Sequence, residues 1–231
     1  MMLDDPQITN SLDDNKPNYN LSSLQFARLD EYIRITGKKL PHWHQSGKVQ
    51  FVTFRLADSL PQEKLAEWEA KKKEWYDAHP KPWDSETTEE YNNVFGEIVG
   101  KWLDAGYGRC ILQYEDVRRV VVDALLFYHN KRYVLHSFVV MPNHVHVLVS
   151  PIGEDTVMKS IGGVKQHSSK VINKLLGRSG DVWQRLVFDR LVRSWKDYER
   201  YVNYIIANPH HLPPNTFSLW SAIDDVSVPV E

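Results

Sequence analysis

The chain has 231 residues, of which 42% are hydrophobic; it contains eight tryptophans and carries a formal net charge of -2. This length and composition indicate a globular protein with one main domain and exclude a disordered chain. The near-neutral net charge produces no overall positive field that would attract nucleic acid. Binding of nucleic acid would therefore depend on a local group of basic residues.

Cys110 is the only cysteine, which excludes an intrachain disulfide and a zinc site built from several cysteines. The sequence begins with acidic residues, where a secretory signal would be basic and then apolar. No apolar run approaches the roughly 18 residues that a membrane span requires. We therefore expect a cytoplasmic protein without membrane contact.

The first 24 residues are polar and acidic, with four aspartates against Lys16 as the only basic residue. So few apolar residues give this segment little to pack with. We expect residues 1–39 to form a flexible arm, residues 40–212 a single domain, and residues 213–231 a C-terminal tail.

The first strand is expected at residues 48–56, where β-branched and aromatic residues alternate. His42 and His44 precede it beside a proline and a tryptophan, and we expect them to have packing or loop roles. A helix opens at Pro61, a residue that suits the first helical turn, and reaches Trp75. Two further helices are expected at residues 87–103 and 115–128. Together, residues 61–128 are predicted to form a helical insertion or cap.

Strands are expected at residues 133–140 and 144–149, joined by a tight turn that makes them antiparallel neighbours. A helix at residues 156–176, a strand at 185–192 and a helix at 196–208 follow. This order predicts an α+β fold of ferredoxin-like or RRM-like type, in which an antiparallel sheet carries flanking helices on one face and the inserted helical segment.

His144 and His146 stand two residues apart on the predicted strand, so their side chains leave the same face. On the last helix, Tyr204 and Asn208 are four residues apart and lie on one face if the helix continues. Pro209 biases Asn208 away from helical geometry, which weakens this second pairing.

Two imidazoles and an amide oxygen form a three-ligand set that leaves a divalent ion open to substrate. A phenol with a pKa of about 10 is a weak nucleophile at neutral pH, and a nearby cation favours its phenolate. Tyr204 beside such an ion could attack a phosphodiester and keep the bond energy for rejoining.

Local charge supports a nucleic-acid substrate. Between residues 165 and 200, nine basic side chains face four acidic ones, with aromatic residues between them. Basic and aromatic side chains together suit single-stranded nucleic acid through phosphate contacts and base stacking. The predicted DNA-contacting residues are Lys165, Lys170, Arg185, Arg190 and Arg193.

The chain resembles the REP-associated tyrosine transposases, a branch of the single-tyrosine HUH transposases of insertion-sequence type. The resemblance rests on the histidine motif Met141–His146 followed by Tyr204–Pro209, and extends to the sequences at residues 40–43, 51–56, 183–184, 189–193 and 197–198. It departs from the family pattern in the long helical stretch 61–128 and in the two histidines after Pro209.

The resemblance implies that His144, His146 and Asn208 bind Mg²⁺ or Mn²⁺ and that Tyr204 is the nucleophile. The implied activity is cleavage and rejoining of single-stranded DNA, at hairpins of palindromic repeats, through a 5′-phosphotyrosine intermediate. The family leaves monomer and homodimer both open. Two alternatives also stay open: a nucleic-acid-binding protein that does not cut, and a metallohydrolase that uses water as its nucleophile.

Overall fold

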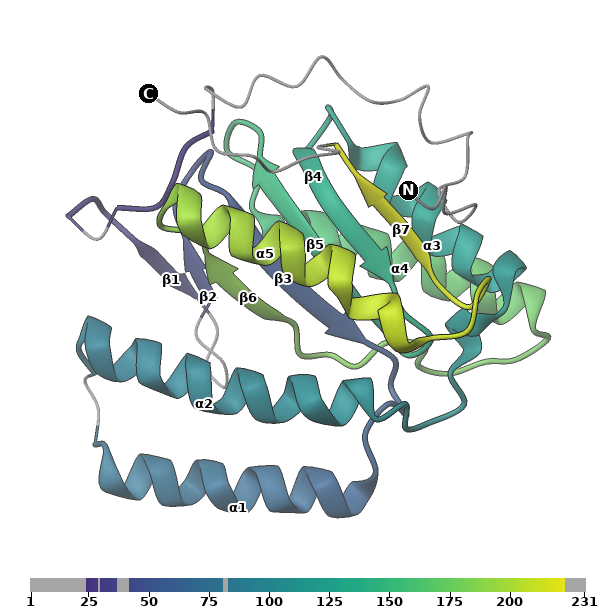
Figure 1. Ribbon diagram of the computed structural model, residues 1–231, viewed down its shortest axis with the longest axis horizontal. Helices are drawn as coiled ribbons and strands as arrows, with labels where there is room; N and C mark the ends of the chain where they lie inside the picture. The colour runs from purple at the N-terminus through teal and green to yellow at the C-terminus, as the bar shows by residue number, and fades with distance from the viewer. Residues whose placement is uncertain (1–23, 29, 37–41, 81–82, 223–231) are drawn as a thin grey trace, which may run out of the picture.

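The computed structural model describes residues 24–28, 30–36, 42–80 and 83–222. Its centre is an antiparallel five-stranded sheet with the order β6-β3-β5-β4-β7 (Figure 1). The strands are β3 (Gln50–Arg55), β4 (Tyr133–Val140), β5 (His144–Pro151), β6 (Phe188–Leu191) and β7 (Ser218–Ser221).

Two helices cover one face of this sheet, α3 (Glu115–Tyr128) and α4 (Val157–Leu175). Alternate residues of β3 and β5 supply the apolar surface beneath them, including Phe54 and Val147, both fully buried. The strand order β6-β3-β5-β4, with α3 and α4 as the crossovers, is the ferredoxin-like arrangement, so the predicted α+β class is confirmed.

The prediction that all helices lie on one face is wrong for α5 (Trp195–Ala207), which covers the opposite face (Figure 1). Tyr198, Val202 and Ile205 form its buried stripe and pack against Leu148 of β5. The central strands are buried on both faces, so each face needs a helical cover. This second layer brings the C-terminal helix over β5.

The predicted insertion at residues 61–128 divides into two parts. Helices α1 (Gln62–Ala78) and α2 (Ser85–Asp104) lie side by side beyond the β6 side of the sheet (Figure 1) and share a separate apolar cluster around Trp68, Tyr91 and Phe95. Helix α3, after the short turn η3 (Ile111–Gln113), belongs to the central core instead. A sheet of this type needs a helix between β3 and β4, and α3 supplies it.

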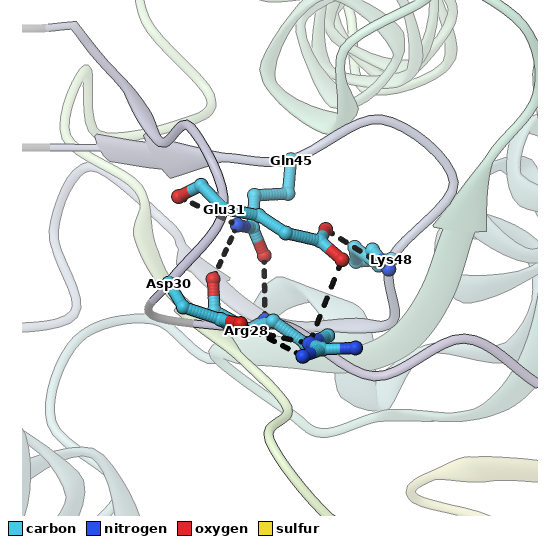
Figure 2. Close-up of polar contacts among 5 residues, drawn as sticks. All are labelled: Arg28, Asp30, Glu31, Gln45 and Lys48. Carbon is cyan, nitrogen blue, oxygen red and sulfur yellow. Dashed lines mark hydrogen bonds and ion pairs between the residues drawn. The ribbon is translucent and has the colours of Figure 1, made fainter.

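Sequence patterning did not predict the two-stranded sheet of β1 (Arg34–Thr36) and β2 (His42–His44). The segment before it is bound to the domain, because the Ala27 N–H donates to the Val192 carbonyl. The buried Gln45 side chain also exchanges two hydrogen bonds with the Arg28 backbone, of 3.0 and 2.7 Å (Figure 2). Part of the predicted arm is therefore attached to the core, while residues 1–23 lie outside the described residues.

Strand β7 was also not predicted, because it falls in the stretch expected to be a tail. It pairs with β4 and places Trp220, almost fully buried, against Phe138. The strand is only four residues long, which is too short to show a repeating pattern in the sequence. The domain limits drawn from the sequence remain predictions.

The adjacent glycines of α4 have different surroundings, which gives a stability test. A Cβ on Gly162 would meet no atom within 4 Å, whereas one on Gly163 would lie 2.9 Å from the Tyr128 hydroxyl. We expect Gly162→Ala to stabilise the protein by roughly 0.5–1 kcal/mol, since alanine is the better helix former. Gly163→Ala should lose this gain by crowding Tyr128. Urea unfolding of both variants measures the difference, and equal free energies of unfolding would contradict the close α3–α4 approach.

Candidate active site

The two histidines of the His-x-His motif lie at the centre of the molecule. His144 and His146 project from β5 toward the face covered by α5, and both are almost fully buried, at 1% and 3% exposed. Their Nε2 atoms are 3.0 Å apart. The strand therefore holds two imidazole nitrogens directed at one point, as the i, i+2 spacing predicted.

Each histidine is oriented by a partner on its other nitrogen. His144 Nδ1 lies 2.7 Å from Asn143 Oδ1, and the Asn143 amide nitrogen donates to the carbonyls of Leu103 and Tyr107. Because that amide nitrogen is engaged, Oδ1 accepts and His144 Nδ1 carries the proton. The lone pair of His144 is then on Nε2, the atom that faces His146.

Thr53 holds the second histidine. It lies directly opposite His146 in the β3–β5 register, and its Oγ1 is 2.7 Å from His146 Nδ1. Phe51, two residues earlier on β3, stacks on the His146 ring at 5.4 Å between centroids. The sequence analysis assigned no role to Thr53, Phe51 or Asn143, although all three lie inside the motifs that carry the resemblance.

Burial sets the charge of this pair. It lowers the pKa of His146 to about 3 and that of His144 well below its ordinary value, with smaller contributions from His146 and His211. Both imidazoles are therefore neutral at pH 7, the form in which histidine binds metal ions. His211, on the turn η4 (Asn208–His211) after α5, was not predicted to lie near the site.

Tyr204 reaches this pair from α5. Its hydroxyl oxygen lies 3.4 Å from His146 Nε2, and its ring meets the Phe51 ring edge-on. The residue is 36% exposed, whereas Tyr198 on the same helix is fully buried. Of these two tyrosines, only Tyr204 combines contact with the histidines and access to solvent.

Asn208 keeps helical geometry, so the expected bias from Pro209 does not break the i, i+4 pairing. Its φ and ψ are -54° and -45°, and its N–H donates to the Tyr204 carbonyl. Pro209 is the second residue of the 3-10 turn η4, within its first turn, where the N–H that proline lacks would have no partner inside the turn. Asn208 Oδ1 is buried and has no hydrogen-bond partner among the described residues. Such an acceptor is costly unless another group satisfies it.

The predicted DNA-contacting residues do not form one cluster. Arg190 lies opposite Phe51 in the β3–β6 register, so its side chain projects from the face of the sheet that carries His144 and His146. Lys165 and Lys170 are on α4, which covers the other face. Arg185 and Lys170 are exposed, and Lys165 is partly buried, where its ammonium donates to two carbonyls.

Within the described residues, no group of three or more His, Cys, Asp or Glu side chains is placed to hold a metal ion. A site with three protein ligands there would need a donor of another residue type beside the two histidines. In the same part of the chain, no helix has the length and apolar character needed to cross a membrane.

The part of the chain that contains both histidines and Tyr204 is similar to known transposases. Residues 112–204 match the family model described as "Transposase IS200 like", a range that contains both histidines and ends at Tyr204. A curated relative, the REP-associated tyrosine transposase of Escherichia coli (strain K12), is 24% identical over 98 residues. That match covers 42% of this chain and 54% of the relative, so it spans about half of the relative's length.

Among solved structures, "Structure of the REP associates tyrosine transposase bound to a REP hairpin" aligns with a TM-score of 0.42 and 16% identity. The alignment covers 75% of this chain and 73% of that one. Residues 112–204 are therefore similar to the IS200-like transposases, and part of the chain is similar to a REP-associated tyrosine transposase.

Proposed function

We propose that the protein cleaves and rejoins single-stranded DNA at hairpins of palindromic repeats through a covalent 5′-phosphotyrosine. The observation that supports this most directly is the position of the Tyr204 hydroxyl, 3.4 Å from one of two buried imidazole nitrogens that face each other. The hairpin substrate is part of the proposal and is suggested by the similarity of part of the chain to a REP-associated tyrosine transposase.

A divalent ion fits the residues present. The 3.0 Å between the two Nε2 atoms matches the edge of an octahedron with bonds of about 2.1 Å, the length that suits Mg²⁺ and similar ions. Two neutral imidazoles and the unpartnered Asn208 Oδ1 are the donor set that the proposal assigns to this ion. His144, His146 and Asn208 would hold the ion.

In this proposal a bound ion supplies charge that stabilises the phenolate and polarises the phosphoryl oxygen. The Tyr204 oxygen attacks the phosphorus, the tyrosine–phosphate bond forms, and the bond to the 3′ oxygen breaks. The phenol proton is lost and the released 3′ oxygen takes up a proton. Rejoining is the reverse, with a 3′ hydroxyl displacing the tyrosine, so no external energy source is needed.

The fold positions these groups before DNA arrives. Phe51 contacts the rings of His146, Tyr201 and Tyr204, which fixes α5 against β5. Asn143 and Thr53 orient the two imidazoles. Preorganisation of this kind keeps the reacting groups in place without rearrangement during the reaction.

The test is a denaturing gel of the protein with labelled single-stranded hairpin DNA from its own genomic flanks, in Mn²⁺ and in chelator. The proposal expects a metal-dependent band that survives SDS. Tight binding without such a band would indicate a protein that holds DNA without cutting it. Cleavage without a covalent band would indicate a metallohydrolase.

The support given by Thr53 can be tested separately. Thr53→Val keeps the shape of the side chain but removes the 2.7 Å contact with His146 Nδ1. Partners of this kind typically contribute 10–100-fold to metal affinity. We expect Mn²⁺ to bind roughly tenfold more weakly to the variant in isothermal titration calorimetry. Unchanged affinity would show that Thr53 does not orient a metal ligand.

A further inference from the structure

Arg55 is a buried cation with unsatisfied hydrogen-bonding capacity. It is the last residue of β3, pairs with His144 across the sheet, and is only 4% exposed. Its Nη1 donates to Ser59 Oγ at 3.0 Å, while its Nε is buried and has no hydrogen-bond partner in the described part of the chain. Arg55 takes no part in the chemistry proposed for Tyr204 and the two histidines.

No acidic side chain neutralises Arg55 among residues 24–28, 30–36, 42–80 and 83–222. Burial lowers the pKa of its guanidinium to about 10, with no carboxylate acting against it. Arg118 is equally buried and shows the contrast, since its donors reach four acceptors: Ser218 Oγ and the carbonyls of Leu112, Gln113 and Asn215. Arg118 therefore has the partners expected of a structural residue, whereas Arg55 has Ser59 Oγ for Nη1 and no partner for Nε.

A second cation lies close to Arg55. The Lys165 ammonium donates to the Gln184 and Arg185 carbonyls, at 2.7 and 3.2 Å, and the Gln184 N–H donates to the Arg55 carbonyl. Burial, and then the Arg55 charge, lower the pKa of Lys165 to about 8. Two partly desolvated cations that repel each other destabilise a fold unless an anion joins them.

We propose that Arg55, with the charge of Lys165 reaching the same end of β3 from α4, forms an anion site for a backbone phosphate of the single-stranded DNA, next to the phosphate attacked at Tyr204. This inference rests on the proposed function. A single strand that passes the histidine pair carries a phosphate at every nucleotide, and β3 places Arg55 beside His144. The planar guanidinium suits two phosphate oxygens at once, and the ammonium adds a point charge.

The arrangement has a physical rationale as a binding device. The cations are desolvated when the protein folds, so a phosphate meets charges that are already stripped of water. The cost appears as reduced stability of the DNA-free protein, a trade-off that is common at functional sites. A phosphate held here would fix the register of the strand relative to Tyr204.

The test measures thermal unfolding of the full chain without DNA and with chelator, while inorganic phosphate replaces chloride at constant ionic strength. We expect phosphate to raise the Tm of the wild type by roughly 2–4 °C and to leave the Tm of Arg55→Met unchanged. In chloride, Arg55→Met should unfold at the same temperature as the wild type or higher, because Ser59 Oγ still donates to the Leu56 carbonyl. Lys165→Met should weaken the response to phosphate.

Arg118→Met is the matched control and should unfold at a lower temperature, because it leaves several buried acceptors unpaired. An Arg55→Met variant that is destabilised like Arg118→Met would overturn the proposal, as would equal phosphate shifts in wild type and Arg55→Met. The assay contains no DNA, so its result is independent of the tyrosine chemistry. A phosphate response without any covalent DNA adduct would keep the anion site and reject the proposed function.

Discussion

Tyr204→Phe is expected to abolish the covalent protein–DNA adduct and leave hairpin binding within about twofold of the wild type. The substitution removes the hydroxyl that lies 3.4 Å from His146 Nε2 and keeps the ring that meets Phe51 edge-on. Without the oxygen, no phosphotyrosine bond can form, and the loss should exceed roughly a thousandfold. SDS gels report the adduct, and a filter-binding or anisotropy assay reports affinity.

Tyr201→Phe is the matched control on the same helix. Tyr201 stacks on Phe51 at 4.4 Å between ring centroids, one turn before Tyr204, so its ring also belongs to the layer between α5 and the sheet. Its phenylalanine variant should form the adduct at the wild-type level. An adduct that persists in Tyr204→Phe and disappears in Tyr201→Phe would move the nucleophile to Tyr201 and reject the assignment made here.

Strong local periodicity made the central elements predictable from the sequence. Helix α3 and strand β4 coincide with their predicted limits, and α4 begins one residue after Thr156, whose side chain caps it. The missed strands β1, β2 and β7 have three or four residues each, too few to show a repeating pattern. Their pairing depends on tertiary neighbours, which the sequence alone does not reveal.

For the candidate site, spacing predicted the residues within each element but not the contacts between elements. The i, i+2 pair on β5 and the i, i+4 pair on α5 both keep the expected geometry. The contact between Tyr204 and His146 depends on α5 crossing the second face of the sheet, which helical periodicity does not specify. Arg55 was missed for a similar reason: as one polar residue in a strand, it shows no sign in the sequence that its charge is buried without a partner.

His144→Ala is expected to remove metal binding and, with it, adduct formation. The variant deletes one of two Nε2 atoms that lie 3.0 Å apart and leaves a single buried imidazole with the Asn208 oxygen. We expect Mn²⁺ affinity to fall at least roughly a hundredfold in calorimetry and the adduct to fall with it. Asn208→Ala should give a smaller loss in both, since an amide oxygen is a weaker ligand than imidazole.

The chain supplies its own control in a second His-x-His pair. His42 contacts the buried Asp189, so His44 is the member to replace. His44→Ala removes an imidazole from a strand with the same spacing and leaves the His42–Asp189 contact in place. This variant should bind Mn²⁺ like the wild type, because its strand lies in the separate two-stranded sheet. If His144→Ala and His44→Ala lost Mn²⁺ affinity equally, the metal site could not be assigned to the His144–His146 pair. Full activity of His144→Ala in chelator would mean that Tyr204 acts without a metal ion and without the His144 imidazole, and it would reject the metal role proposed for the His144–His146 pair.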